Sequence, residues 1–112
     1  LKRVHHALAQ SFAATGDAGP AAAHLARGHY FVGRDVLQAG GRAEAVNYFA
    51  AAVRHDPGFV AGWFYLGEAR RLSGARAGAV EAYRECLRRN PDHGRALAAI
   101  ALLEPDPATV AP

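Results

Sequence analysis

Apolar and polar positions alternate along this chain with the period of an amphipathic helix. In the second half, apolar side chains recur three, four and seven positions apart, which places them on one face of a helix. The residues of that stripe are Leu66, Leu72, Val80, Tyr83 and Leu87. Residues 2–15 have a similar pattern, with Val4, Leu8 and Phe12 on one face. The pattern therefore predicts several short helices that bury one side each.

The same residue types return after 34 positions. The matching pairs are Gly33 with Gly67, Gly40 with Gly74, Ala45 with Ala79, Phe49 with Tyr83, Asp56 with Asn90, and Pro57 with Pro91. A fixed period between 20 and 50 residues is typical of stacked supersecondary units, and about 34 residues is the length of a two-helix repeat. The period predicts a row of helical pairs rather than one globular core.

Glycine and proline mark the predicted helix ends. The Asp56-Pro57 and Asn90-Pro91 steps predict helix starts, since Asp or Asn caps free N–H groups and proline at the first helical position loses no useful donor. Gly40 and Gly74 predict helix ends, where glycine adopts the left-handed conformation. Gly67 and Ala79 are small, so we expect two antiparallel helices to cross closely there.

The residues at the repeated positions indicate which kind of repeat this is. The second unit reads Trp63, Leu66, Gly67, Gly74, Ala79, Tyr83 and Pro91. This unit resembles the tetratricopeptide repeat, whose W-x2-L-G…A-x3-F…P pattern it matches at the same spacings. The preceding unit keeps Gly33, Ala45, Phe49, Ala52 and Pro57. It has His29 and Val32 where the family prefers Trp and Leu, and the second unit has Arg70 and Cys86 where Tyr and Ala are usual.

The resemblance implies an all-α fold of tetratricopeptide-type helix-turn-helix repeats, stacked as a short right-handed solenoid. We expect one repeat domain over residues 1–103. It would comprise a degenerate repeat (1–25), two regular repeats (26–59 and 60–93) and a C-terminal capping helix (94–103). Residues 104–112 are proline-rich and predict a tail or linker. Residues 20–39 predict either one long helix or two helices kinked near Gly28.

The charge distribution argues against nucleic acid as a partner. The chain of 112 residues has a formal net charge of +3. Seven arginines gather in its second half: Arg70, Arg71, Arg76, Arg84, Arg88, Arg89 and Arg95. Nucleic-acid surfaces combine such a patch with stacking aromatics or a groove-reading helix. Here Glu68, Glu81 and Glu85 interrupt the patch, which predicts a solvated helix face. No apolar run approaches the roughly 18 residues of a membrane span.

Neither the histidines nor the cysteine form a recognisable metal or catalytic motif. His24 and His29 are five positions apart, whereas a four-residue spacing suits two ligands on one helix. His5 and His6 are adjacent, so they point in different directions. We expect surface or capping histidines, no cofactor, and a buried Cys86 rather than a reactive thiol. No nucleophile–base pair or phosphate-binding loop can be placed, so we expect no enzymatic activity.

The resemblance also implies a binding surface. In the tetratricopeptide family the first helix of each repeat lines a concave groove that receives a peptide or a partner's helix. The positions carried over are Arg27, Tyr30, Arg34, Leu37, Gln38, Ala61, Phe64, Glu68, Arg71, Arg95 and Ala98. Tyr30 and Phe64 are equivalent positions, and we expect them either to be partly exposed anchors beside the arginines or to pack between helices. The carboxylate clamp of the co-chaperone type needs Lys and Asn at groove positions, which this chain lacks.

Two functions remain open from the sequence. The first is a non-catalytic module that binds a protein or peptide in the groove, or self-associates through an exposed end helix with Ile100, Leu102 and Leu103 as its apolar patch. The second is an accessory or regulatory segment of a larger enzyme or assembly factor whose chemistry lies outside these residues. The absence of a starting Met favours the second as an account of origin.

Overall fold

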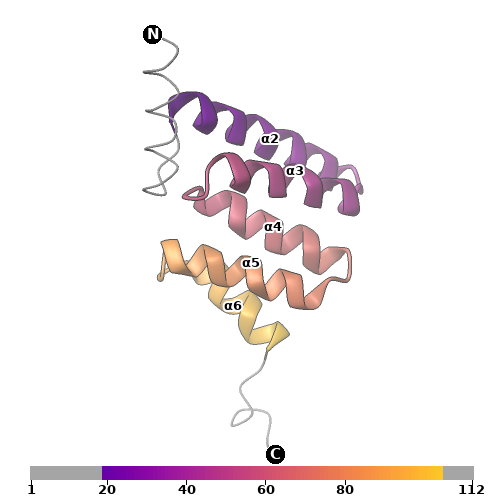
Figure 1. The fold of residues 1–112 in the computed structure, drawn as a ribbon. Coiled ribbons are helices and arrows are strands. Elements are labelled where there is room, and N and C mark those ends of the chain that lie inside the picture. The colour runs from indigo at the N-terminus through magenta and orange to yellow at the C-terminus, as the bar shows by residue number, and fades with distance from the viewer. Residues whose placement is uncertain (1–18, 105–112) are drawn as a thin grey trace, which may run out of the picture.

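The computed structural model describes residues 19–104, and these form a stack of five α-helices. The helices are α2 (Pro20–Gln38), α3 (Arg42–His55), α4 (Val60–Leu72), α5 (Arg76–Arg89) and α6 (Gly94–Leu103). Each helix packs on the next one in chain order (Figure 1). This confirms the all-α fold of stacked tetratricopeptide-type hairpins. The helix predicted over residues 2–15 and the tail after residue 104 lie outside the described residues.

The 34-residue period of the sequence recurs in the positions of the helix ends. Both ends of α3 recur in α5 after 34 residues, and α2 and α4 end at Gln38 and Leu72. Gly40 and Gly74 follow these two ends with φ of 96° and 90°, the left-handed conformation that favours glycine. The predicted helix ends are therefore confirmed. α2 is one continuous helix through Gly28, which decides between the two alternatives for that region.

The prediction that the Asp/Asn-Pro steps begin helices is wrong. Asp56 and Asn90 follow the last residues of α3 and α5, with nearly identical φ/ψ of −138°/87° and −138°/88°. Each side chain accepts a hydrogen bond from the backbone N–H two residues later, at 3.2 Å from Gly58 and 3.3 Å from Asp92. Short polar side chains form such turns as readily as they cap helices, so α4 and α6 begin three residues after the prolines.

Two glycines let an aromatic ring of the next helix approach the backbone. A Cβ on Gly33 would lie 2.9 Å from Cε1 of Phe49, and one on Gly67 would lie 2.7 Å from Cδ1 and Cε1 of Tyr83. The close crossing predicted at Gly67 is present, but the Tyr83 ring is nearest to it rather than Ala79. Each repeat therefore places a bulky ring against a bare stretch of helix.

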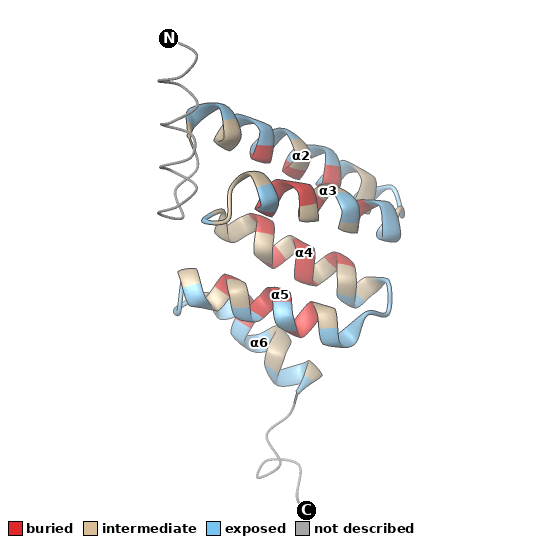
Figure 2. Ribbon diagram, viewed as in Figure 1, coloured by how far each residue is buried: buried red, intermediate tan, exposed pale blue. Residues whose placement is uncertain are grey.

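Buried residues line the sides of the helices that face each other (Figure 2). Phe49, Leu66, Tyr83 and Cys86 are the largest side chains that are fully buried. Burial raises the pKa of the Cys86 thiol, although nearby Arg89 opposes the shift. The full burial of Cys86 confirms the prediction of a core cysteine, and a raised pKa goes with a smaller fraction of thiolate. None of the helices over residues 19–104 is long and apolar enough to cross a membrane.

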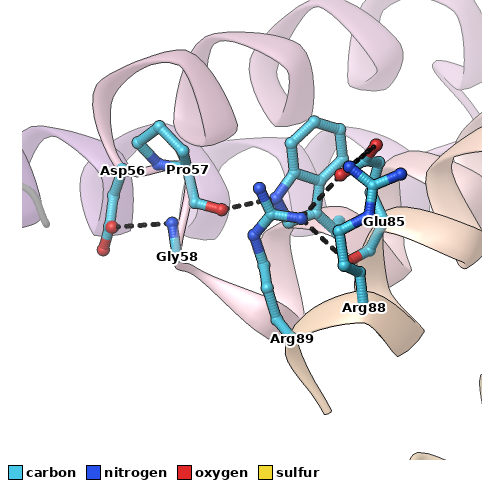
Figure 3. A network of polar contacts seen from close by, with 7 residues as sticks. Asp56, Pro57, Gly58, Glu85, Arg88 and Arg89 are labelled. Carbon is cyan, nitrogen blue, oxygen red and sulfur yellow. Dashed lines mark hydrogen bonds and ion pairs between the residues drawn. The ribbon is translucent and has the colours of Figure 1, made fainter. Parts of the chain in front are cut away.

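A polar network fixes the loop between α3 and α4 against α5 (Figure 3). The indole N–H of Trp63 donates a 2.7 Å hydrogen bond to the carbonyl oxygen of Pro57. The Arg89 guanidinium lies 4.9 Å from the centre of the Trp63 ring and also binds Glu85 at 2.7 Å. Arg88 pairs with the other oxygen of Glu85 at 3.2 Å. Trp63 therefore joins the loop, α4 and α5.

Candidate functional site: a pocket between α4 and α6

An open pocket of about 330 Å³ lies between α4 and α6. Its lining residues are Phe64, Glu68, Arg71, Arg95, Ala98, Ala99 and Leu102. The first three positions recur along one side of α4 at helical spacings of four and three residues, and the remainder come from the facing side of α6. The helices contribute five of the groove positions carried over from the family, including Arg71 and Arg95. The described structure brings these residues together in one place.

Glu68 joins the pocket to the core. The hydroxyl of buried Tyr83 donates a hydrogen bond to Oε1 of Glu68, and Arg71 pairs with Oε2 at 3.2 Å. Burial, together with the bond to Glu68, holds the pKa of Tyr83 well above its usual value of about 10. The hydrogen bond to Glu68 also raises the pKa of Arg71. Glu68 thus uses both oxygens within the protein, and Arg71 is partly neutralised.

Arg95 occupies a different electrostatic position. Its guanidinium lies 4.6 Å from the centre of the Phe64 ring, within the range of a cation–π contact. It forms no ion pair with any residue between 19 and 104. With Arg71 and Arg95 positive and Glu68 negative, the three side chains sum to a single positive charge. The pocket therefore combines one unneutralised cation with an apolar wall.

The expectation that Tyr30 and Phe64 are partly exposed is wrong. Tyr30 is 9% exposed and Phe64 is 3% exposed. Tyr30 packs edge-on against Phe59 and Tyr65, with ring centres 5.0 and 5.6 Å apart, and Phe64 packs against Tyr65 at 5.2 Å. The alternative interpretation, that these rings pack between helices, is the one that fits. Phe64 forms the floor of the pocket rather than an exposed anchor.

The remaining predicted groove residues do not join the α4–α6 pocket. Arg34, Leu37 and Gln38 line a smaller hollow with Tyr65. The Arg34 guanidinium lies 5.1 Å from the Tyr65 ring centre and 3.5 Å from the Tyr30 hydroxyl. Arg34 and Arg71, two of the four arginines predicted for the groove, therefore occupy separate hollows. Arg27 is exposed on α2 and lines neither hollow. Ala61 packs against the buried cluster that includes Tyr30, Phe49 and Leu66.

The sequence did not predict that Leu102 and Ala99 line the pocket, or that Tyr65 packs against the rings of Tyr30 and Phe64. Leu102 is 82% exposed, the highest value among the large exposed hydrophobics of residues 19–104. The predicted end patch was also partly wrong. Ile100 and Leu103 pack against the buried cluster that includes Phe64, Tyr83 and Cys86, while Leu97 is 50% exposed. The missed signal is the period itself. Leu102 is 34 positions after Glu68, so it occupies the same groove-facing position one repeat later.

Most arginines of the predicted basic surface are bound to acceptors of this chain. Arg70 donates to the carbonyl of Gly78 at 3.0 Å, and Arg76 donates through Nε to that of Leu103 at 2.8 Å. Arg84 pairs with Glu104. These contacts link α4 to α5 and hold the end of α6. The arginine cluster therefore contributes to packing between the helices.

Two histidine environments are defined among residues 19–104. His93 caps α6, where its Nδ1 accepts a 3.1 Å hydrogen bond from the Ala96 N–H. His29 stacks on His55, with ring centres 5.3 Å apart and planes 1° from parallel. The prediction of a capping histidine is confirmed at His93. In the same described range, no three His, Cys, Asp or Glu residues gather as a possible metal group.

One comparison with known proteins bears on the family. The chain is 36% identical over 63 residues to a TPR repeat-containing protein of Pseudomonas aeruginosa. The match covers 56% of this chain and 60% of that relative, so it spans less than two thirds of the relative's length. No protein-family model matches the chain. Together with the stacked hairpins and their 34-residue period, this relative supports a tetratricopeptide-like family for the chain.

Proposed function

We propose that the protein is a non-catalytic interaction module that binds a peptide or a partner's helix in the α4–α6 pocket. One observation carries the proposal. Side chains from the second regular repeat and from the capping helix, five of them at positions carried over from the family's groove, line one open pocket with an exposed Leu102 at its wall. Protein-binding sites obtain most of their affinity from a few aromatic and arginine anchors in places that exclude water, and this pocket offers Arg95 over the Phe64 ring.

The charges of the pocket favour a ligand with one acidic group beside a bulky apolar side chain. Arg95 is the cation that no residue between 19 and 104 neutralises by an ion pair. Ala98 and Ala99 are small, so they leave room beside Leu102 for an apolar side chain. A second acidic group would gain less, because Arg71 already binds Glu68. The ligand would thus differ from a multiply acidic peptide tail.

A matched pair of substitutions on α6 tests this site. Ala98→Trp fills the pocket, whereas Ala101→Trp places the same side chain at an exposed position of α6 that does not line it. Peptides would be selected from a displayed random library on the parent protein and then titrated against both variants. We expect Ala98→Trp to bind about 30-fold more weakly, the equivalent of about 2 kcal/mol for a hot spot. Ala101→Trp should bind like the parent.

Equal affinities for the parent and both variants would show that the selected peptides bind elsewhere. The helical content of each variant, measured by circular dichroism, is the control for folding. If Arg95→Gln weakens acidic peptides and neutral peptides equally, the inferred preference for one acidic group is wrong, although the pocket itself would remain the site.

The outer face of α6 favours the second candidate, an accessory segment that docks against a further helix. Ala101 is 34 positions after Gly67, the position against which the next helix packs its aromatic ring. Leu97 is half exposed on the same helix. In this alternative the helix that covers α6 belongs to the larger assembly. Sedimentation of the parent and Leu97→Glu separates this alternative from self-association. If a second copy covers this face, the parent should dimerise and the variant should not, whereas an accessory segment should remain monomeric in both forms.

A further inference from the structure

The outer face of α2 carries a long apolar groove at the other end of the stack. It has a volume of about 680 Å³ and includes Leu25, Gly28 and Val32 of α2 with Tyr48 of α3. Leu25 is 52% exposed and Val32 is 43% exposed. Leu25, Gly28 and Val32 follow one another at spacings of three and four residues, which places them in a stripe along α2. The buried residues Ala26, Tyr30 and Gly33 lie on a different side, against the rest of the stack.

Gly28 makes a hollow in the middle of this groove. A Cβ built on Gly28 meets nothing within 4 Å, unlike those on Gly33 and Gly67, which would touch a ring. A large apolar side chain from a covering element could therefore lie over Gly28.

We propose that residues 2–15 of the same chain cover this groove as an antiparallel helix. This inference is independent of the proposed function. The sequence of that segment has Val4, Leu8 and Phe12 at intervals of four residues, which forms one apolar side of a helix. Only the four residues 16–19 separate it from the first residue of α2. Such a short connection makes consecutive helices antiparallel neighbours.

The hairpins of the structure give the register of this contact. In an antiparallel hairpin, the average of two facing residue numbers lies near the middle of the connection between the helices. Gly33 faces Phe49, and their numbers average 41, one position after residue 40, the middle of the α2–α3 connection. Gly67 and Tyr83 have a mean of 75, one position after the middle of the α4–α5 connection at 74. Across the α3–α4 connection, Gly62 faces Val53 with a mean of 57.5, which is the middle of residues 56–59.

The same rule aligns the apolar side of residues 2–15 with the groove. The middle of residues 16–19 is 17.5, so facing residues should have a mean between 17.5 and 18.5 and a sum between 35 and 37. Phe12 then faces positions 23–25, Leu8 faces 27–29, and Val4 faces 31–33. Each range contains one member of the exposed stripe, namely Leu25, Gly28 and Val32. Leu8 thus falls on the hollow at Gly28.

Covalent connection favours this occupant over a second copy or a free peptide. A segment tied by a short linker has an effective concentration in the millimolar range. A second copy at micromolar concentration would need a much larger intrinsic affinity to compete for the same groove. A cross-link across the groove distinguishes the two possibilities: it would join two parts of one chain if residues 2–15 cover the groove, and two chains if a second copy does.

Paired cysteines test the register in the full chain. Leu8→Cys with Gly28→Cys should form an intramolecular disulfide under mild oxidation, because both thiols lie in the groove. Leu8→Cys with Arg27→Cys is the matched control. Arg27 lies at the same level along α2 but points about 100° around the helix axis from Gly28, and it is exposed and does not line the groove. The native Cys86 is fully buried and stays out of the reaction. We expect the first pair to close at least tenfold faster on a non-reducing gel.

Two results would overturn the proposal: equal closure rates for both pairs, or a disulfide-linked dimer as the main product. A double-mutant cycle measured by thermal unfolding provides an independent check that needs no oxidation. Phe12→Ala and Leu25→Ala should each lower the melting midpoint by a few degrees, because about 1 kcal/mol corresponds to roughly 4–8 °C in a domain of this size. The double variant should lower it by less than the sum. Strictly additive shifts would show that the two side chains do not touch.

Discussion

The contact between Gly67 and Tyr83 makes a sharp prediction about stability. In Gly67→Ala, the new Cβ would lie 2.7 Å from two ring carbons of Tyr83, whereas carbon atoms pack at about 3.5–4.0 Å. The ring must therefore move by about 1 Å. Tyr83 is fully buried beside Phe64, at 5.8 Å between ring centres, and its hydroxyl is bound to Glu68. The ring has little free space into which it can move.

The expected magnitude follows from two opposing terms. Overpacking a core costs about 1–3 kcal/mol, and replacing glycine by alanine inside a helix contributes about 1 kcal/mol in the other direction. The net loss should be about 1 kcal/mol, which lowers the melting midpoint by roughly 4–8 °C. Gly33→Ala should cost less, because its Cβ would lie 2.9 Å from the Phe49 ring. Gly94→Ala is the control, since nothing lies within 4 Å of that position.

Thermal unfolding followed by circular dichroism measures these shifts. A second measurement isolates the ring: in a Tyr83→Leu background, Gly67→Ala should no longer destabilise the protein. A midpoint for Gly67→Ala equal to or above that of the parent would refute the reasoning. The same is true if the loss in Gly67→Ala persists after the ring has been removed.

Two further predictions concern the core and the loop network. Because burial raises the pKa values of Tyr83 and Cys86, their contribution to stability is complete below the unfolded-state values of about 10 and 8.5; it declines as the pH rises above them. Denaturant titrations between pH 8 and 11 should show this decline, with a shallower slope in Tyr83→Phe than in the parent. Trp63→Phe removes the hydrogen bond to Pro57 and should cost about 1 kcal/mol; an unchanged denaturation midpoint would contradict the role of the network.

Periodicity predicted the parts of the fold that depend on local backbone chemistry. The left-handed glycines Gly40 and Gly74 could be identified because few other residues adopt that conformation at low cost. The Asp/Asn-Pro steps could not be assigned correctly, because the same side chain either caps a following helix or closes a turn after a preceding one. In this chain the side chains close turns: Asp56 and Asn90 accept hydrogen bonds from the backbone N–H groups of Gly58 and Asp92.

The candidate site was less predictable, because its residues depend on how the helices rotate against each other. Tyr30 and Phe64 occupy groove positions in sequence, yet Tyr65 and its neighbouring rings cover them. Leu102 was expected to share a patch with Ile100 and Leu103, but only Leu102 faces the pocket. A residue's repeat position indicates which helix face it occupies, whereas its exposure depends on side chains of the next helix.

Because the turns at Asp56 and Asn90 have nearly identical backbone angles, the repeat between them can be duplicated as a unit. A segment that runs from one turn to the equivalent point of the next begins and ends with the same backbone direction. A duplicate of residues 57–90 inserted after Asn90 would therefore join the helices on both sides of it through the same turn that the chain already uses. In such arrays each added unit contributes its own stability and one more interface. The protein could thus be lengthened in steps of one hairpin. The α4–α6 pocket would form only at the last junction, because each internal junction places a copy of Phe64 and Glu68 where α6 has Ala98 and Leu102.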